Sequence, residues 1–200
     1  ACLFQHPPLK GPRMAIVTHA GGPGVMLTDA LEKVGLQVPP LSEELKGRLL
    51  PQLFPGSSAN NPIDILATGT PDQLRFVLET MVHSSEVDGV AVIFGSAGLF
   101  DVTPAYEVLI ECIRKFRDKP IYPILPSLVT AENAVAFFKG HGHVFFPDEV
   151  LFGQMLGAVY SAKPESIEVS PLSPKKFSIS SMVPHATTGY LKPEDALSLL

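Results

Sequence analysis

The chain has 200 residues, and 46% of them are hydrophobic, which is enough to bury one α/β core with a further segment. Its formal net charge is -5 and no run of lysine or arginine occurs, so nucleic-acid and membrane partners are not expected. Cys2 and Cys112 lack the spacing of a metal or redox motif, and no stretch approaches the roughly 20 apolar residues that span a bilayer. These features favour a globular, cytoplasmic protein without a metal site.

Composition divides the chain into a proline-rich beginning, a central region and a tail. We interpret residues 1–12 as an N-terminal linker, residues 13–162 as one domain and residues 163–188 as a second linker. Residues 189–200 have the pattern of a helix that opens a following domain. The chain begins with Ala1 rather than methionine and stops within that helix pattern, so we expect it to be a piece of a longer polypeptide.

Strand and helix patterns alternate through the central region. An apolar run predicts a strand at 14–18, and apolar residues at helical spacing predict a helix that ends near Gly35. Residues 36–38 suit a short strand, and a short helix is expected to begin at Ser42 and to end near Leu50. A loop dense in turn residues follows, at 55–64.

The best-marked helix of the chain begins at Thr70. Pro71 and Gln73 complete the signature of a capping box, and apolar residues recur at helical spacing as far as Met81. This alternation predicts a doubly wound parallel sheet, flavodoxin-like or Rossmann-like. The remaining expected elements are a strand at 90–94, a helix at 104–117, a strand at 120–125, a helix at 130–139, a short strand at 144–146 and a helix at 148–161.

Loops at the carboxyl ends of parallel strands are the usual ligand sites of such sheets. Three of these loops, at 19–24, 60–70 and 95–98, are rich in glycine or turn residues. The first follows a strand and opens a helix, whose free amides and positive dipole end favour a phosphate. It matches neither the P-loop nor the dinucleotide fingerprint, so a tight turn between strand and helix explains the same glycines.

Each candidate residue in these loops also has a structural explanation. His19 lies within the glycine turn, where it contacts a ligand or fills an exposed corner. Asn61 and Asp64 bracket a proline and can organise a turn through their own side chains. Thr70 caps an amide that a phosphate would otherwise take, and Asp72 adds a negative charge. The candidate phosphate-binding or ligand-binding residues are His19, Gly21, Gly22, Gly24, Asn61, Asp64, Gly69, Thr70, Gly95, Ser96 and Gly98.

Five short motifs occur in order along the chain: RMAIVTHAGGPG at 13–24, DAL at 29–31, LSE at 41–43, NPID at 61–64 and TP at 70–71. Together they resemble one region of the NDP-forming acyl-CoA synthetases, the relatives of succinyl-CoA synthetase that include ADP-forming acetyl-CoA synthetase. The resemblance extends over about residues 10–160. It implies that 13–162 is the flavodoxin-like CoA-ligase domain and that 189–200 begins an ATP-grasp domain.

The reaction implied by the resemblance interconverts acyl-CoA, phosphate and NDP with the free acid, CoA and NTP. It proceeds through an acyl phosphate and a phosphohistidine. The family's histidine lies in a Ser-His-Thr-Gly loop of a different domain, and that loop is absent from this sequence, so no catalytic residue is expected here. The implied partners are the CoA-binding, phosphohistidine and ATP-grasp domains of the same or another chain. CoA, ATP or ADP and Mg would be bound by the parent chain, and the fragment alone would bind no cofactor and be inactive.

The resemblance also suggests roles for the three loops. Those at 19–24 and 68–72 would present helix amino termini to the phosphohistidine, and 95–98 matches a glycine-rich stretch near the acyl group. His19 stands where relatives often carry asparagine or serine. Two other interpretations remain open: a regulatory ligand-binding module of a synthetase-like lysine acetyltransferase, and a structural docking domain.

Overall fold

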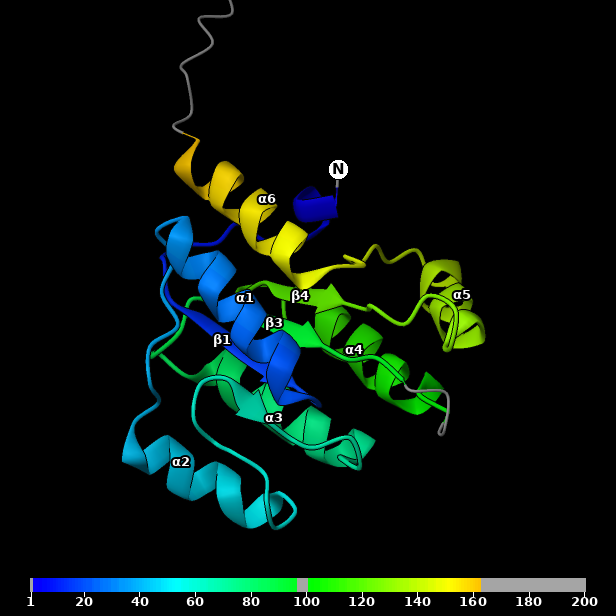
Figure 1. The fold of residues 1–200 in the computed structure, drawn as a ribbon, viewed down its shortest axis with the longest axis horizontal. Coiled ribbons are helices and arrows are strands. Elements are labelled where there is room, and N and C mark those ends of the chain that lie inside the picture. Colours follow the sequence, from blue (N-terminus) through cyan, green and yellow to red (C-terminus); the bar gives the residue numbers. More distant parts are fainter. Residues whose placement is uncertain (1, 97–100, 163–200) are drawn as a thin grey trace, which may run out of the picture. The chain divides into compact units, whose positions relative to one another are not determined.

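The structure is a computed structural model that describes residues 2–96 and 101–162 (Figure 1). Helices and strands alternate along the chain, as the sequence predicts. The elements are η1 (Cys2–Gln5), β1 (Met14–Thr18), α1 (Gly21–Lys33), α2 (Glu43–Leu49), η2 (Leu50–Gln52), β2 (Ile63–Asp64), α3 (Pro71–His83), β3 (Gly89–Ile93), α4 (Thr103–Lys115), β4 (Ile121–Ile124), α5 (Glu132–Gly140) and α6 (Glu149–Ser161).

The four strands form one parallel sheet in the order β2-β1-β3-β4. Val17 of β1 lies opposite Ile63 on one side and opposite Val92 on the other. Because β1 has β2 and β3 on its two sides, the chain reverses its winding between β1 and β3, which is the topological switch point of a doubly wound sheet. The predicted fold class is confirmed.

Two of the predicted strands are wrong, and one strand of the sheet was not predicted. Residues 36–38 and 144–146 each contribute a single bridge, Arg13 with Gln37 and Ile124 with Phe146. Each segment therefore pairs with the sheet through one residue only, which is too short to count as a strand. The strand that was not predicted is β2, which has only two residues and lies within the turn-rich segment 60–70. It is too short to give an apolar pattern in the sequence.

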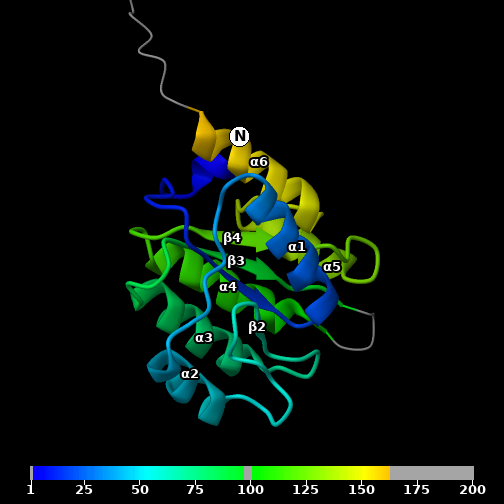
Figure 2. The ribbon, with the colours of Figure 1, turned by 60° about the vertical axis from the view of Figure 1, so that its left-hand side comes forward.

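Two helical layers cover the sheet (Figures 1 and 2). Helices α1 and α6 pack together on one face, and α3 and α4 pack together on the other, with α5 beside α4. The side chains of β1 alternate between these layers: Ile16 belongs to the core under α1 and α6, and Val17 to the core under α3 and α4. This double burial explains why β1 and β3 are continuous apolar runs.

Two glycines of α6 allow a close approach to α1. A Cβ atom added at Gly153 would lie 2.8 Å from the Cβ atom of Ala30. A Cβ atom added at Gly157 would overlap the side chain of Val34, including its Cβ atom. The α1–α6 contact therefore depends on the absence of side chains at these two positions.

Candidate functional site

The carboxyl ends of the strands gather most of the candidate loops at one edge of the sheet. In Figure 1 the arrowheads of β1, β3 and β4 point to the right-hand side, where α1 also begins. His19 follows β1, Asp64 ends β2, and Ser96 lies three residues beyond β3. Gly98, a candidate from the third loop, lies outside the described residues.

The glycine stretch is the first turn of α1 rather than a loop, which corrects the expected loop at 19–24. Gly21 is the first helical residue, and the N-cap residue Ala20 makes no side-chain capping bond. No acidic residue lies in the first turn of the helix. The amides of Gly21 and Gly22 therefore lie at the positive end of the helix without a side-chain cap.

The three glycines of this turn have different surroundings. A Cβ atom at Gly24 would lie 3.2 Å from both the Pro62 Cβ and the Thr18 Cγ2 atoms, so Gly24 serves the packing of α1 on β1 and β2. A Cβ atom at Gly22 would meet nothing within 4 Å. Gly22 therefore faces open space at the amino end of the helix.

His19 bridges the two strands of the switch point. Its Nδ1 atom lies 3.2 Å from the carbonyl oxygen of Ile93, and its ring stacks on Phe94 with centroids 5.0 Å apart. Burial lowers the pKa of His19, although the Ile93 carbonyl and the Asp64 carboxylate oppose this change. The imidazole is therefore largely neutral at pH 7. Nδ1–H donates to Ile93, and Nε2 carries the lone pair.

Asp64 places a carboxylate beside the start of α1. Its Oδ1 atom accepts a hydrogen bond of 2.8 Å from the amide of Leu66, which has a φ of 65°. Its Oδ2 atom lies 3.6 Å from the position of a Cβ atom at Gly21. The carboxylate thus takes part of the space that faces the helix dipole, and an anion bound there must lie on the side of α1 away from Asp64.

Asn61 is held entirely by backbone groups. Its Oδ1 atom accepts from the amide of Ile16 at 2.9 Å, and its Nδ2 atom donates to the carbonyls of Met14 at 2.8 Å and Pro39 at 2.9 Å. These bonds fix the segment before β2 against the edge of β1. They give Asn61 a positioning role, and direct contact with a ligand stays a prediction.

The start of α3 has fewer free amides than the start of α1. Thr70 and Gln73 form the predicted capping box, with the amide of Gln73 3.2 Å from Thr70 Oγ1 and the amide of Thr70 3.0 Å from Gln73 Oε1. Pro71 has no amide hydrogen, and Asp72 adds a negative charge. Gly69 is needed for the tight turn, since a Cβ atom there would lie 2.6 Å from the Ile65 carbonyl oxygen. Contact between Thr70 and a phosphate therefore gains no support from this geometry.

Two residues that the sequence pattern did not reveal hold the loop after β3. The amide of Ser96 donates to Ser127 Oγ at 2.7 Å, and Thr130 Oγ1 donates to the Ser96 carbonyl at 2.6 Å. A Cβ atom at Gly95 would lie 2.5 Å from Ser127 Oγ, so glycine is required for this contact. Ser127 and Thr130 follow β4, and only the order of the strands brings them to the loop after β3. The sequence gives one indication of this role: Ser127 and Thr130 directly follow a predicted strand, so they lie at the same edge of the sheet as the other candidate loops.

The described part of the chain supports neither a metal centre nor a membrane span. Among the described residues, no group of three or more His, Cys, Asp or Glu side chains could hold a metal ion. No helix in the same residues is long and apolar enough to cross a bilayer. The described groups at this edge are helix amides, small residues, the His19 imidazole and the Asp64 carboxylate.

The sheet order and the switch-point site define a doubly wound α/β domain with its candidate binding edge beside α1. A family model described as Ligase-CoA domain matches residues 14–166. The chain therefore belongs to the Ligase-CoA domain family.

Relatives of this domain are parts of larger synthetase subunits. The chain is 28% identical over 143 residues to the alpha subunit of acetate–CoA ligase [ADP-forming] II from Pyrococcus furiosus, covering 70% of this chain and 31% of that subunit. It is 26% identical over 159 residues to the alpha subunit of isoenzyme I from the same organism, covering 79% and 34%. It thus spans about a third of the length of these curated relatives. A dinucleotide-forming acetyl-coenzyme A synthetase 1 from Ca. Korarchaeum cryptofilum shares the fold, with a TM-score of 0.69, 21% identity and coverage of 80% of this chain and 35% of that one.

Proposed function

We propose that this chain is the CoA-ligase domain of an NDP-forming acyl-CoA synthetase, and that the start of α1 forms one wall of its phosphate site. The observation that carries the proposal is the uncapped amino end of α1 at the switch point, in a chain whose residues 14–166 match the Ligase-CoA domain. The named activities of the two Pyrococcus furiosus relatives, ADP-forming acetate–CoA ligases, support the reaction class.

The work of this domain would be electrostatic rather than covalent. A phosphoryl group carried by a histidine of another domain would meet the amides of Gly21 and Gly22, which lower the energy of its negative charge. His19 would border the same space as a neutral imidazole, through the Nε2 lone pair. In this proposal the other domains of the synthetase would bind the nucleotide, CoA and any Mg²⁺.

The variant Gly22→Asp, which adds a negative charge at the start of α1, tests this role in the full-length protein. An acidic residue in the first turn favours the helix through its dipole, while the added carboxylate repels a phosphate. At about 5 Å and an effective dielectric constant of 20 to 80, this repulsion is worth roughly 1–3 kcal/mol. We expect the apparent KM for phosphate, in acyl-CoA-dependent formation of NTP, to rise about fivefold or more, with thermal stability kept or increased.

Gly47→Asp in α2 is the matched control. A Cβ atom at Gly47 also meets nothing within 4 Å, so this variant adds the same charge in open space away from the switch point. We expect its KM for phosphate to be unchanged. If Gly22→Asp leaves the KM unchanged as well, the phosphate role of α1 is wrong. If the unmodified protein forms no NTP from acyl-CoA, NDP and phosphate, the proposed reaction is wrong.

A further inference from the structure

The outer side of the α1–α6 layer is rich in exposed apolar side chains. Among the described residues, neither α3 nor α4, the pair on the opposite face of the sheet, exposes a large apolar side chain. The exposed apolar side chains of α1 and α6 are Val25, Met26, Leu151, Met155, Val159 and Tyr160.

Helix α6 has the composition of a helix that is covered on all sides. Glu149 is the one charged residue among its 13 residues. Its inner side, which includes Phe152 and Leu156, is already buried against the core. Its outer side carries Leu151, Met155 and Val159 at intervals of four residues, so these three side chains form a continuous apolar row. Because a helix that is apolar on every side is normally buried, the outer row indicates a contact surface.

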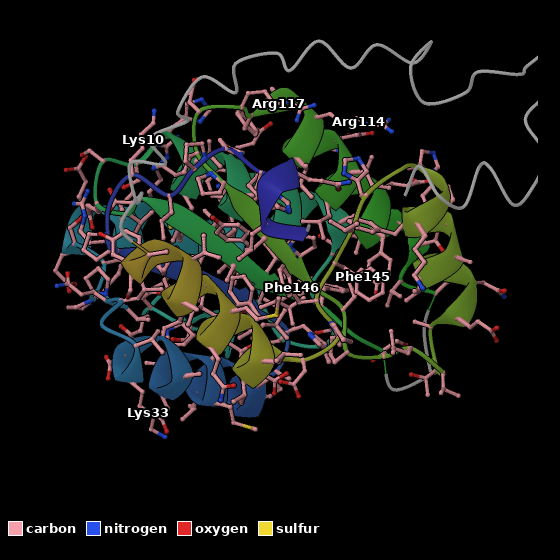
Figure 3. The ribbon with its side chains drawn as sticks, turned by 90° about the horizontal axis from the view of Figure 1, so that it is seen from above. Lys10, Lys33, Arg114, Arg117, Phe145 and Phe146 are labelled. Carbon is pink, nitrogen blue, oxygen red and sulfur yellow. The ribbon has the colours of Figure 1, made fainter. Side chains whose placement is uncertain are left out.

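A groove lies between the two helices next to this row. It has a volume of about 430 Å³ and is lined by apolar side chains that include Met26, Val34 and Val150. Two residues of opposite charge, Asp29 and Lys33, also line it, and Lys33 extends outward from α1 in Figure 3. An apolar groove with one acidic and one basic group fits a protein segment that inserts apolar side chains and carries the complementary charges.

The beginning of the described domain lies beside α6. Leu3, near the first described residue, packs against the core cluster that contains Phe152 and Leu156 of α6. Figures 1 and 2 both show the beginning of the chain next to this helix, and α6 is itself the last described element. A domain that directly precedes the described residues in a longer chain would therefore lie near α6.

We infer that the surface formed by α1 and α6 is the docking face for another domain of the synthetase. This inference rests on the proposed function, since the matched relatives are about three times as long as the region they share with this chain. Leu151, Met155 and Val159 are the central contacts of the surface, and the groove beside Met26 receives an apolar side chain of the partner domain. Asp29 and Lys33 set the orientation of the partner.

Site-specific photo-crosslinking tests the docking face in the full-length protein, purified together with any subunits that bind it. A photoreactive p-benzoylphenylalanine replaces Met155 in one variant and Val129 in the control. Val129 is also apolar and is 87% exposed, but it lies before α5. We expect the probe at 155 to crosslink to a peptide of another synthetase domain, and the probe at 129 to give no such product.

Other possible occupants of the surface would give different results in this experiment. A crosslink to a second copy of α6, to residues 163–200 or to no protein at all overturns the inference, as does occupation of the groove by a small apolar molecule. A second measurement uses Leu151→Asp with Met155→Asp, against Val129→Asp. We expect the double variant to increase hydrogen exchange in the crosslinked peptide at least tenfold and the control to leave it unchanged; equal exchange in both overturns the inference.

The two proposals fail separately in these experiments. Crosslinking and hydrogen exchange need no substrate, so the docking face can be established even if Gly22→Asp leaves the KM for phosphate unchanged. If Gly22→Asp raises the KM for phosphate but position 155 gives no interdomain crosslink, the phosphate role is supported and the docking face is wrong.

Discussion

The close contact between α6 and α1 makes Gly157→Ala a sharp test of the packing. The added Cβ atom would overlap the Cβ and Cγ2 atoms of Val34, and no change of rotamer can move a Cβ atom aside. The two helices must therefore separate, and such overpacking costs about 1–3 kcal/mol. Replacing a helical glycine by alanine returns about 0.5–1 kcal/mol. We expect a net decrease of up to about 2.5 kcal/mol in the free energy of unfolding.

Gly47→Ala in α2 provides the control, because a Cβ atom there meets nothing within 4 Å. We expect this variant to be more stable than the unmodified chain by about 0.5–1 kcal/mol. Urea unfolding followed by circular dichroism measures both changes. The double variant Gly157→Ala with Val34→Gly removes the overlap, so it should destabilise by less than the sum of the two single variants. If Gly157→Ala is as stabilising as Gly47→Ala, the described helix contact is wrong.

Two further predictions concern polar side chains that are fully or partly buried. Burial, with the positive charges of His143 and Arg117, lowers the pKa of His6 to about 4, so the unfolded chain takes up a proton at a higher pH than the folded chain. The free energy of unfolding should fall by up to about 3 kcal/mol as the pH decreases from 7 to 4. His6→Phe should reduce this pH dependence in urea titrations at several pH values, and an equal dependence would refute the assignment. Asn61→Ala removes three backbone contacts and should destabilise by about 2–4 kcal/mol, whereas the exposed control Asn60→Ala should cost less than about 1 kcal/mol; similar losses in the two would contradict the role of Asn61.

The sequence was sufficient for the elements whose signals are local. The continuous apolar run of β3 identifies a strand that is covered on both faces, and the capping box at Thr70 fixes the start of α3 to the residue. The helix pattern after Gly21 likewise predicts α1. In each of these, a period or a cap within one segment carries the information.

The features that the sequence did not reveal depend on contacts between distant segments. The bonds of Ser127 and Thr130 to Ser96 join residues more than 30 positions apart and exist only because β4 lies beside β3. The glycine stretch was expected to form a loop before the helix, yet Gly21 is the first residue of α1 and Gly24 packs closely on Pro62 and Thr18. The electrostatic potential at the start of α1 also depends on the Asp64 carboxylate, which lies 43 residues beyond Gly21 in the sequence.

Asn61 has a consequence for how the sheet ends. Strand β2 is too short to cover β1, and the primary amide of Asn61 pairs with the Met14 carbonyl and the Ile16 amide as a peptide group of a neighbouring strand would. Gln37 and Ile65 pair with Met14 and Thr18 on either side of it. One side chain thus substitutes for a missing stretch of strand, and it closes an edge at which an extended segment of a second molecule could otherwise add and start aggregation.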